Sequence, residues 1–258
     1  MRDKTGAGIV DCKKALEESG GDIDKAVEIL RKKGIAKAAK RSEREASEGV
    51  IKILTNEEAN EAYILEVNAE TDFVARNEKF QDFANQVIDM IKVCKPGNLD
   101  ELLNLSMAES TVGEALKNLS SVIGEKLEIR GFDILTGDTV AAYSHMGGRI
   151  GVIVAIDKTD AKELAYDLAM QIAAANPRYI NSSEVPAEEI EKEKSIYREQ
   201  LLKEGKPENM LEKIMEGKIN KYFEEICLVD QDYIKDDKKK VRDILGDVKV
   251  KKFIRYSL

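Results

Sequence analysis

Apolar residues recur at helical spacing in the first 40 residues and predict two short helices. Gly20-Gly21 separates the two patterns, and Gly34 stands where a glycine is expected just after a helix end. The apolar positions are Ile9, Cys12, Ala15 and Leu16 in the first helix and Ile23, Ala26, Val27 and Leu30 in the second. Two short helices bury little apolar surface by themselves, so this unit at residues 1–40 needs a third helix or a partner.

The two ends of this unit are charged. The chain opens on Met1 to Lys4, residues typical of the end of a helix, so we expect the first helix of the unit to be truncated. Residues 35–48 carry charge without a sustained apolar stripe. This pattern predicts a charged, partly helical segment, with a linker at 41–48.

From residue 49 the period changes to that of strands followed by helices. Apolar runs at 50–54 and 62–67 predict a β-hairpin with its turn at 56–60. A helix should follow, with Phe80, Phe83, Ala84, Val87 and Ile91 on its inner face. Another helix should begin at Thr111, where Thr111 and Glu114 fit a capping box, and a strand is expected at 127–135.

The second half of the chain repeats this order. Residues 140–144, a turn at Gly147-Gly148 and residues 149–156 predict a second hairpin. Asp160 and Glu163 are expected to cap the next helix, whose inner face carries Leu164, Leu168, Ile172 and Ala175, and residues 248–258 read as a final strand. The repeated order predicts two related sheet-plus-helix subdomains, at 49–137 and 138–258. The fold class is then α+β, with antiparallel sheets covered by helices on one side.

The two halves differ in the connection between the second strand and the helix. The first half has a longer loop at 68–76, which contains Thr71, Asp72, Phe73 and Val74, whereas the second has only residues 157–159. Loops that carry apolar side chains are usually packed down or used for binding. The sequence leaves both alternatives open for Phe73.

Residues 187–226 interrupt the second half with two further apolar stripes. Ile190, Tyr197 and Leu201 lie on the first stripe, which stops at Gly205 and Pro207. The return stripe contains Leu211, Ile214, Met215, Ile219, Tyr222, Phe223 and Ile226. A short connection between two such helices predicts an antiparallel coiled-coil hairpin that projects from the body.

Charge and cysteine usage narrow the classes of partner. The net charge is −8 at pH 7 and the isoelectric point is about 5.1, so a nucleic acid is a poor candidate partner. Cys12, Cys94 and Cys227 are sparse and form no CxxC pair, which favours a reducing compartment. No apolar run of about 18 residues is present, so no membrane span is expected. These features favour a cytosolic, soluble protein.

Candidate catalytic chemistry is scarce. His145 is the single histidine, and no serine or cysteine lies in a recognisable nucleophile motif. A metal site lacks a second histidine, and neither GxxxxGK[ST] nor GxGxxG occurs. We therefore expect a binding protein without a cofactor, a metal or a bound nucleotide, and not an enzyme.

Three segments together resemble a known family. They are TGAGIVDCKKAL at 5–16, TDFVARNEKF at 71–80 and HMGGRIGV at 145–152, and their order and spacing are similar to those of the elongation factor Ts family. Further similar segments are EILRKKG at 28–34, GKPENMLEKIMEGKINKYFEE at 205–225 and FIRYSL at the end. The resemblance implies an N-terminal domain like ubiquitin-associated domains, a core of two related subdomains and an inserted coiled-coil hairpin.

The resemblance also implies a function. Members are guanine nucleotide exchange factors that bind elongation factor Tu with GDP and promote GDP release so that GTP can bind. By resemblance, Thr71, Asp72, Phe73 and Val74 dislodge Mg²⁺ from the GTPase, while Ile9, Val10, His145 and Gly148 contact it. Ile9 and Val10 stand where many members have two methionines, a conservative apolar change. The alternative function is a protein-binding adaptor built on the ubiquitin-associated-like domain, which would leave residues 49–258 without a role.

Overall fold

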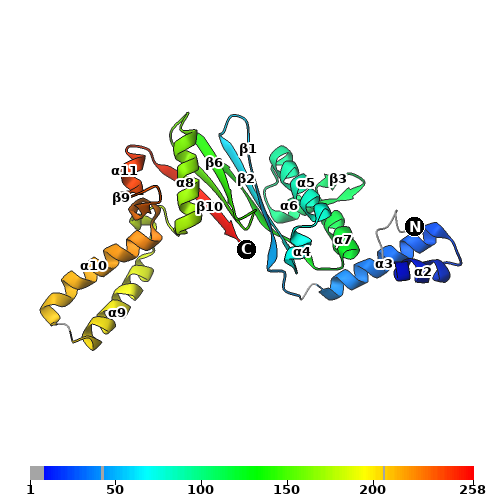
Figure 1. Ribbon diagram of the computed structural model, residues 1–258, viewed down its shortest axis with the longest axis horizontal. Coiled ribbons are helices and arrows are strands. Elements are labelled where there is room, and N and C mark those ends of the chain that lie inside the picture. The colour runs from blue at the N-terminus through cyan, green and yellow to red at the C-terminus, as the bar shows by residue number, and fades with distance from the viewer. Residues whose placement is uncertain (1–8, 42–43, 206) are drawn as a thin grey trace.

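The computed structural model describes residues 9–41, 44–205 and 207–258 (Figure 1). Its first elements are helices α2 (Ile9–Glu18) and α3 (Ile23–Arg41), which contact each other. Cys12, Ala15 and Ala26 are buried between them. The Asp22 carboxylate caps α3, because its Oδ1 accepts hydrogen bonds from the backbone N–H of Asp24 and Lys25.

The predicted helix end at Gly34 is wrong, because α3 continues through Gly34 to Arg41. A glycine inside a helix costs only about 1 kcal/mol relative to alanine. The alanines and lysines that follow are good helix formers and offset this cost. The expected truncated helix at the start lies outside the described residues.

The first sheet consists of β1 (Glu48–Thr55), β2 (Glu61–Ala69) and β5 (Leu127–Thr136), antiparallel in the order β1-β2-β5. Its outer face packs on α5 (Glu78–Cys94) and α7 (Val112–Ile123), and α3 contacts α7. The capping box of Thr111 and Glu114 is present at the start of α7. Four short elements were not predicted: α4 (Asp72–Ala75), α6 (Leu99–Asn104), β3 (Ser106–Met107) and β4 (Ser110–Thr111).

The second sheet consists of β6 (Thr139–His145), β7 (Ile150–Ile156) and β10 (Val250–Ser257), antiparallel in the order β10-β7-β6. Helix α8 (Lys162–Ala175) covers its outer face with Leu168 and Ile172 buried. The prediction that Asp160 caps α8 is wrong. The N-cap is Ala161, which makes no side-chain cap bond, and Asp160 adopts a left-handed conformation with φ of 54° in the preceding turn.

Two long helices leave the second half and lie side by side, α9 (Ala187–Lys203) and α10 (Glu208–Ile226) (Figure 1). At their base the Glu189 carboxylate accepts hydrogen bonds from Tyr179, Tyr222 and Arg178. These bonds lower the pKa of Glu189, the hydrogen bond from Tyr222 most. The short elements around this base are η1 (Ser182–Glu184), η2 (Leu228–Asp230), β8 (Asp232–Tyr233), β9 (Asp236–Lys240) and α11 (Val241–Leu245).

The inner faces of the two three-stranded sheets pack against each other. Ile51 and Ile64 of the first sheet share a core cluster with Ile153 and Ala155 of the second. The layers therefore run from α8 through the second and first sheets to α5 and α7 (Figure 1). The α+β class is confirmed. Three points stay predictions: that the two halves are related subdomains, where their boundaries lie, and that α9 and α10 form a coiled coil.

Gly151 allows the closest approach between the sheets. A Cβ at Gly151 would lie 2.4 Å from Cγ2 of Ile51 and 3.2 Å from Cγ2 of Ile53. Both neighbours are branched side chains held in strand β1, so neither can move aside freely. The sequence pattern contained no sign of this requirement, because a glycine inside a strand also fits a bulge or a bend.

We expect Gly151→Ala to lower the free energy of unfolding by about 1–3 kcal/mol, because the added methyl group overpacks the layer between the sheets. Gly217→Ala is the matched control. Gly217 lies in α10, and no atom lies within 4 Å of the place that a Cβ would take, so alanine there should raise stability by about 0.5–1 kcal/mol. Urea unfolding of both variants measures the difference. Equal stability of Gly151→Ala and the parent chain would contradict this packing.

Candidate functional site

The segment Thr71 to Val74 forms most of a short helical turn, so the prediction of a plain loop needs correction. Thr71 is the N-cap of α4, and its Oγ1 accepts a hydrogen bond from the backbone N–H of Val74 at 3.4 Å. Glu125, which follows α7, binds the same residue twice. Its carboxylate accepts from the Thr71 N–H at 3.0 Å and from the Thr71 hydroxyl at 2.8 Å.

Contacts on the other side of the turn complete its support. The Gln81 side-chain amide donates to the carbonyl of Ala75 at 2.5 Å, and Ala75 itself is buried. Val74 is half-buried against the core between the first sheet and α5. One residue before the turn, Glu70 accepts from the backbone N–H of Lys126 at 2.6 Å. The backbone of the turn is therefore held from both flanks.

The Phe73 side chain lies outside this framework. It is 84% exposed, more than Ile9 at 68% or Met146 at 65%. Leaving an aromatic side chain in water forgoes about 1.5–3 kcal/mol of burial. The structure thus excludes one of the two alternatives for the loop, because Phe73 is not packed onto the core of the chain, and the use of this side chain in binding stays a prediction.

Asp72 faces two guanidinium groups. Its carboxylate forms an ion pair with Arg76 one turn later, at 2.9 Å. The pKa of Arg149 is raised, chiefly by the hydrogen bond to Glu48, with a smaller contribution from the charge of Asp72. Arg149 belongs to the tip of the β6–β7 hairpin and binds Glu48 at the start of β1, and α4 also contacts β1, so the tip and α4 adjoin the same strand.

The tip of the β6–β7 hairpin exposes two of its side chains. His145 is exposed, and its Nδ1 lies 3.0 Å from the hydroxyl of Tyr143, with the two rings stacked at 5.9 Å. Met146 is 65% exposed in a left-handed conformation with φ of 51°. The tip therefore presents an imidazole and a thioether at its surface.

Gly148 has an internal role. It is buried, its φ is +91°, and its carbonyl oxygen accepts a hydrogen bond from the N–H of Ile51 at 2.7 Å. A Cβ there would lie 2.9 Å from Cγ2 of Val50. The residue joins the hairpin tip to the edge of the first sheet, and its predicted contact with a partner is untested.

Ile9 and Val10 are exposed at 68% and 65% on the first turn of α2. Helix α2 lies at one end of the molecule, apart from α4 (Figure 1). The structure therefore places both α4 and the 145–149 turn against strand β1, and it leaves the N-terminal pair as a separate exposed apolar surface.

Sequence reasoning missed the residues that support the site. Glu125 binds Thr71 across 54 positions in the chain, and Glu48 binds Arg149 across 101. No local pattern marks either carboxylate, because the partners meet only after the sheets have formed. A weak signal existed for Arg149, which directly follows the glycine turn.

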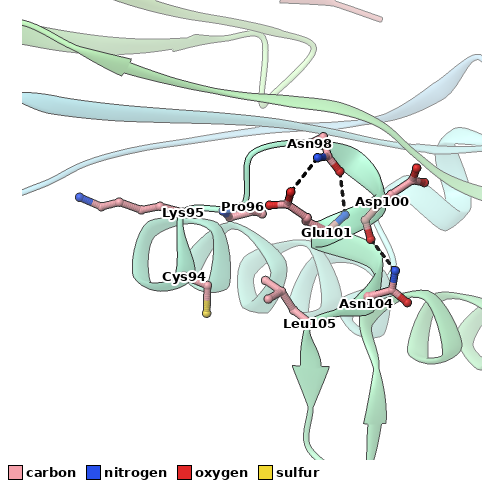
Figure 2. A pocket seen from close by; sticks show the side chains of 8 residues that line it. All are labelled: Cys94, Lys95, Pro96, Asn98, Asp100, Glu101, Asn104 and Leu105. Carbon is pink, nitrogen blue, oxygen red and sulfur yellow. Dashed lines mark hydrogen bonds between the residues drawn. The ribbon is translucent and has the colours of Figure 1, made fainter.

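Figure 2 shows an open hollow beside the end of α5, lined in part by Cys94, Lys95 and Asn98. Its polar groups bind one another: Asn98 Oδ1 accepts from the N–H of Glu101, and Asn104 donates to the carbonyl of Asp100. Lys95 is paired with Glu61 at 2.6 Å. The hollow therefore offers no set of converging polar groups to a ligand.

Two other kinds of site were sought in the part of the chain that the structure describes. No group of three or more His, Cys, Asp or Glu side chains that could hold a metal ion occurs within residues 9–41, 44–205 and 207–258. Over the same described ranges, none of the helices is both long enough and apolar enough to cross a membrane.

Comparison with known protein families gives a match to the family described as Elongation factor TS, over residues 70–258. The matched range covers most of the chain. It includes α4, the hydrogen-bonded pair of Thr71 and Glu125, and the tip of the β6–β7 hairpin. The family resemblance found in the sequence is thereby confirmed. Ile9 and Val10 lie outside the matched range.

We expect Thr71→Val to loosen α4 without unfolding the chain, because valine keeps the shape but loses the cap and the hydroxyl bond to Glu125. Loss of an N-cap costs about 1 kcal/mol, which corresponds to about fivefold faster amide exchange at Val74 and Ala75. Residue-resolved hydrogen exchange measures this. Ser121→Ala is the control, since the Ser121 hydroxyl donates to the carbonyl of Lys117 within α7. Unchanged exchange at Val74 and Ala75 would show that Thr71 does not hold the turn.

Proposed function

This chain belongs to the elongation factor Ts family of translation elongation factors, and from that premise we propose that it binds elongation factor Tu and promotes release of its GDP. The observation that carries the proposal is the exposed aromatic side chain of Phe73 on a turn whose backbone is held by Glu125 and Gln81. Such a side chain is ready to enter an apolar gap in a partner protein.

The proposed act is the loss of Mg²⁺ from the GTPase. GTPases hold GDP through a phosphate-binding loop and a Mg²⁺ ion that switch elements keep in place. Phe73 is proposed to wedge beside such an element, while Asp72 disturbs the polar network around the ion. Thr71 and Val74 serve the turn itself, the first as its cap and the second as its apolar anchor.

A turn that is already ordered in the free chain is better suited to act as a wedge than a flexible loop is. A loop that becomes ordered on binding loses about 0.5–1.5 kcal/mol for each immobilised side chain. Here the backbone is already fixed in the free chain, so more of the burial energy of Phe73 remains for distorting the partner. Burial of one phenylalanine contributes about 1.5–3 kcal/mol, which is one to two decades in nucleotide affinity.

Further contacts must therefore add to the effect of Phe73. The exposed side chains of Ile9 and Val10 on α2 and of His145 on the hairpin tip are proposed to supply them. Thermodynamic linkage then applies in both directions. Bound GDP must weaken the GTPase's affinity for this factor by the same ratio by which the bound factor weakens the GTPase's affinity for GDP. The complex is thus expected to be transient whenever nucleotide is plentiful, and the factor itself holds no nucleotide.

We expect Phe73→Ala to slow stimulated GDP release by about tenfold or more, because the wedge is lost while the turn keeps its backbone contacts. Stopped-flow release of a fluorescent GDP analogue from elongation factor Tu measures the rate. Val93→Ala is the matched control, since Val93 is 80% exposed on α5 and lies outside the site. A wild-type rate with Phe73→Ala would remove the basis of the proposal.

We expect His145→Ala to have a smaller effect on the same release rate than Phe73→Ala. The imidazole is exposed on the hairpin tip, and it contacts Tyr143 by a hydrogen bond and by stacking. Titration of the factor separates its affinity for the GTPase from the maximal rate. If both quantities remain unchanged, His145 is an ordinary surface residue of the hairpin tip.

A further inference from the structure

We propose that Arg149 is a positioning residue that holds the α4 turn and the 145–147 turn together as one contact surface. The inference rests on the proposed function of Phe73, which it extends to a residue outside that turn. Arg149 lies at the end of the hairpin turn, directly before β7 of the second sheet, and binds Glu48 at the start of β1 in the first sheet.

The side chain of Arg149 reaches the strand pair that leads into α4. Its Nη1 donates to Oε2 of Glu48 at 2.6 Å. Glu48 opens β1 and is paired with Ala69, the last residue of β2 and two positions before Thr71. The guanidinium therefore spans from the hairpin tip to the base of the α4 turn.

The backbone around Arg149 is fixed independently of its side chain. The carbonyl of Gly148 accepts from the N–H of Ile51 at 2.7 Å, and the carbonyl of Arg149 accepts from the N–H of Leu258 at 3.0 Å. The origin of the side chain is thus set by main-chain bonds to both sheets. Loss of the guanidinium should leave these bonds, and with them the fold, in place.

The charges between the two turns alternate in sign. Glu48 pairs with Arg149, the charge of Asp72 acts on the same guanidinium, and Asp72 also pairs with Arg76 at 2.9 Å. The chain of charges runs from the first sheet through the hairpin tip to α4. Without the Arg149 guanidinium, the Glu48 carboxylate would lose this ion pair, while Asp72 would keep its ion pair with Arg76.

The energetic scale favours positioning over fold stability. The Glu48 and Arg149 side chains are 30% and 44% exposed, and ion pairs with that access to water add little to stability. The ion pair between Glu48 and Arg149 can instead fix the relative orientation of the two turns, which must contact the same partner at the same time. A loose pair of turns would have to be ordered during binding, which lowers the rate of productive association.

The first test uses the free chain and needs no partner. We expect Arg149→Ala and Glu48→Gln each to raise amide exchange about threefold or more in both segments, 71–76 and 145–149, with the unfolding midpoint retained. Arg149→Lys should restore part of the protection. Lys251→Ala is the matched control, since Lys251 pairs with Asp138 at 2.9 Å across 113 positions and lies elsewhere on the second sheet. A rise in only one segment, or in neither, would overturn the proposal.

The second test is a double-mutant cycle on stimulated GDP release. If Arg149 acts through Glu48, Arg149→Ala should slow release about threefold to tenfold in the parent chain and have almost no effect beside Glu48→Gln. Equal losses in both backgrounds would mean that Arg149 touches the GTPase directly and would overturn a positioning role. If the parent chain releases no GDP, the proposed function fails, whereas the exchange test still decides whether Arg149 couples the two turns.

Discussion

The contact between the inner faces of the two three-stranded sheets determines where every part of the candidate site lies. Ile51, Ile64 and Ile153 fill this contact, and Gly151 lets the strands approach. The same contact places the N–H of Ile51, on the outer edge of β1, opposite the carbonyl of Gly148. One backbone N–H on the open edge of β1 thereby gains a partner, and the hairpin tip is fixed against the strand that α4 also contacts.

Periodicity predicted the strands and long helices well because each buries one face, and a buried face leaves a regular apolar pattern. Elements without such a pattern were missed. Helix α4 has four residues, and tertiary bonds from Glu125 and Gln81 hold it. Helix α3 runs past Gly34 because local helix formers outweigh one unfavourable glycine, a balance that a rule for helix ends does not weigh.

The sequence singled out candidate residues for the site but did not reveal their arrangement. The extra length of the 68–76 loop and its aromatic side chain singled out Thr71 to Val74. Whether Phe73 packs inward depends on space in a core that sequence does not reveal, and the structure gives the answer with 84% exposure. Gly148 illustrates the reverse case, because a residue expected at a partner surface proves to be buried against Val50 and Ile51.

The separation between the backbone of α4 and the ring of Phe73 has an evolutionary consequence. Thr71, Ala75 and Glu125 carry the stability of the turn, while the ring contributes nothing to it and lies in water. Selection for folding or solubility alone would tolerate, and even favour, a polar residue at position 73. Binding of a partner by Phe73, as proposed, would select for an aromatic side chain there, so the two pressures act on neighbouring positions without constraining each other.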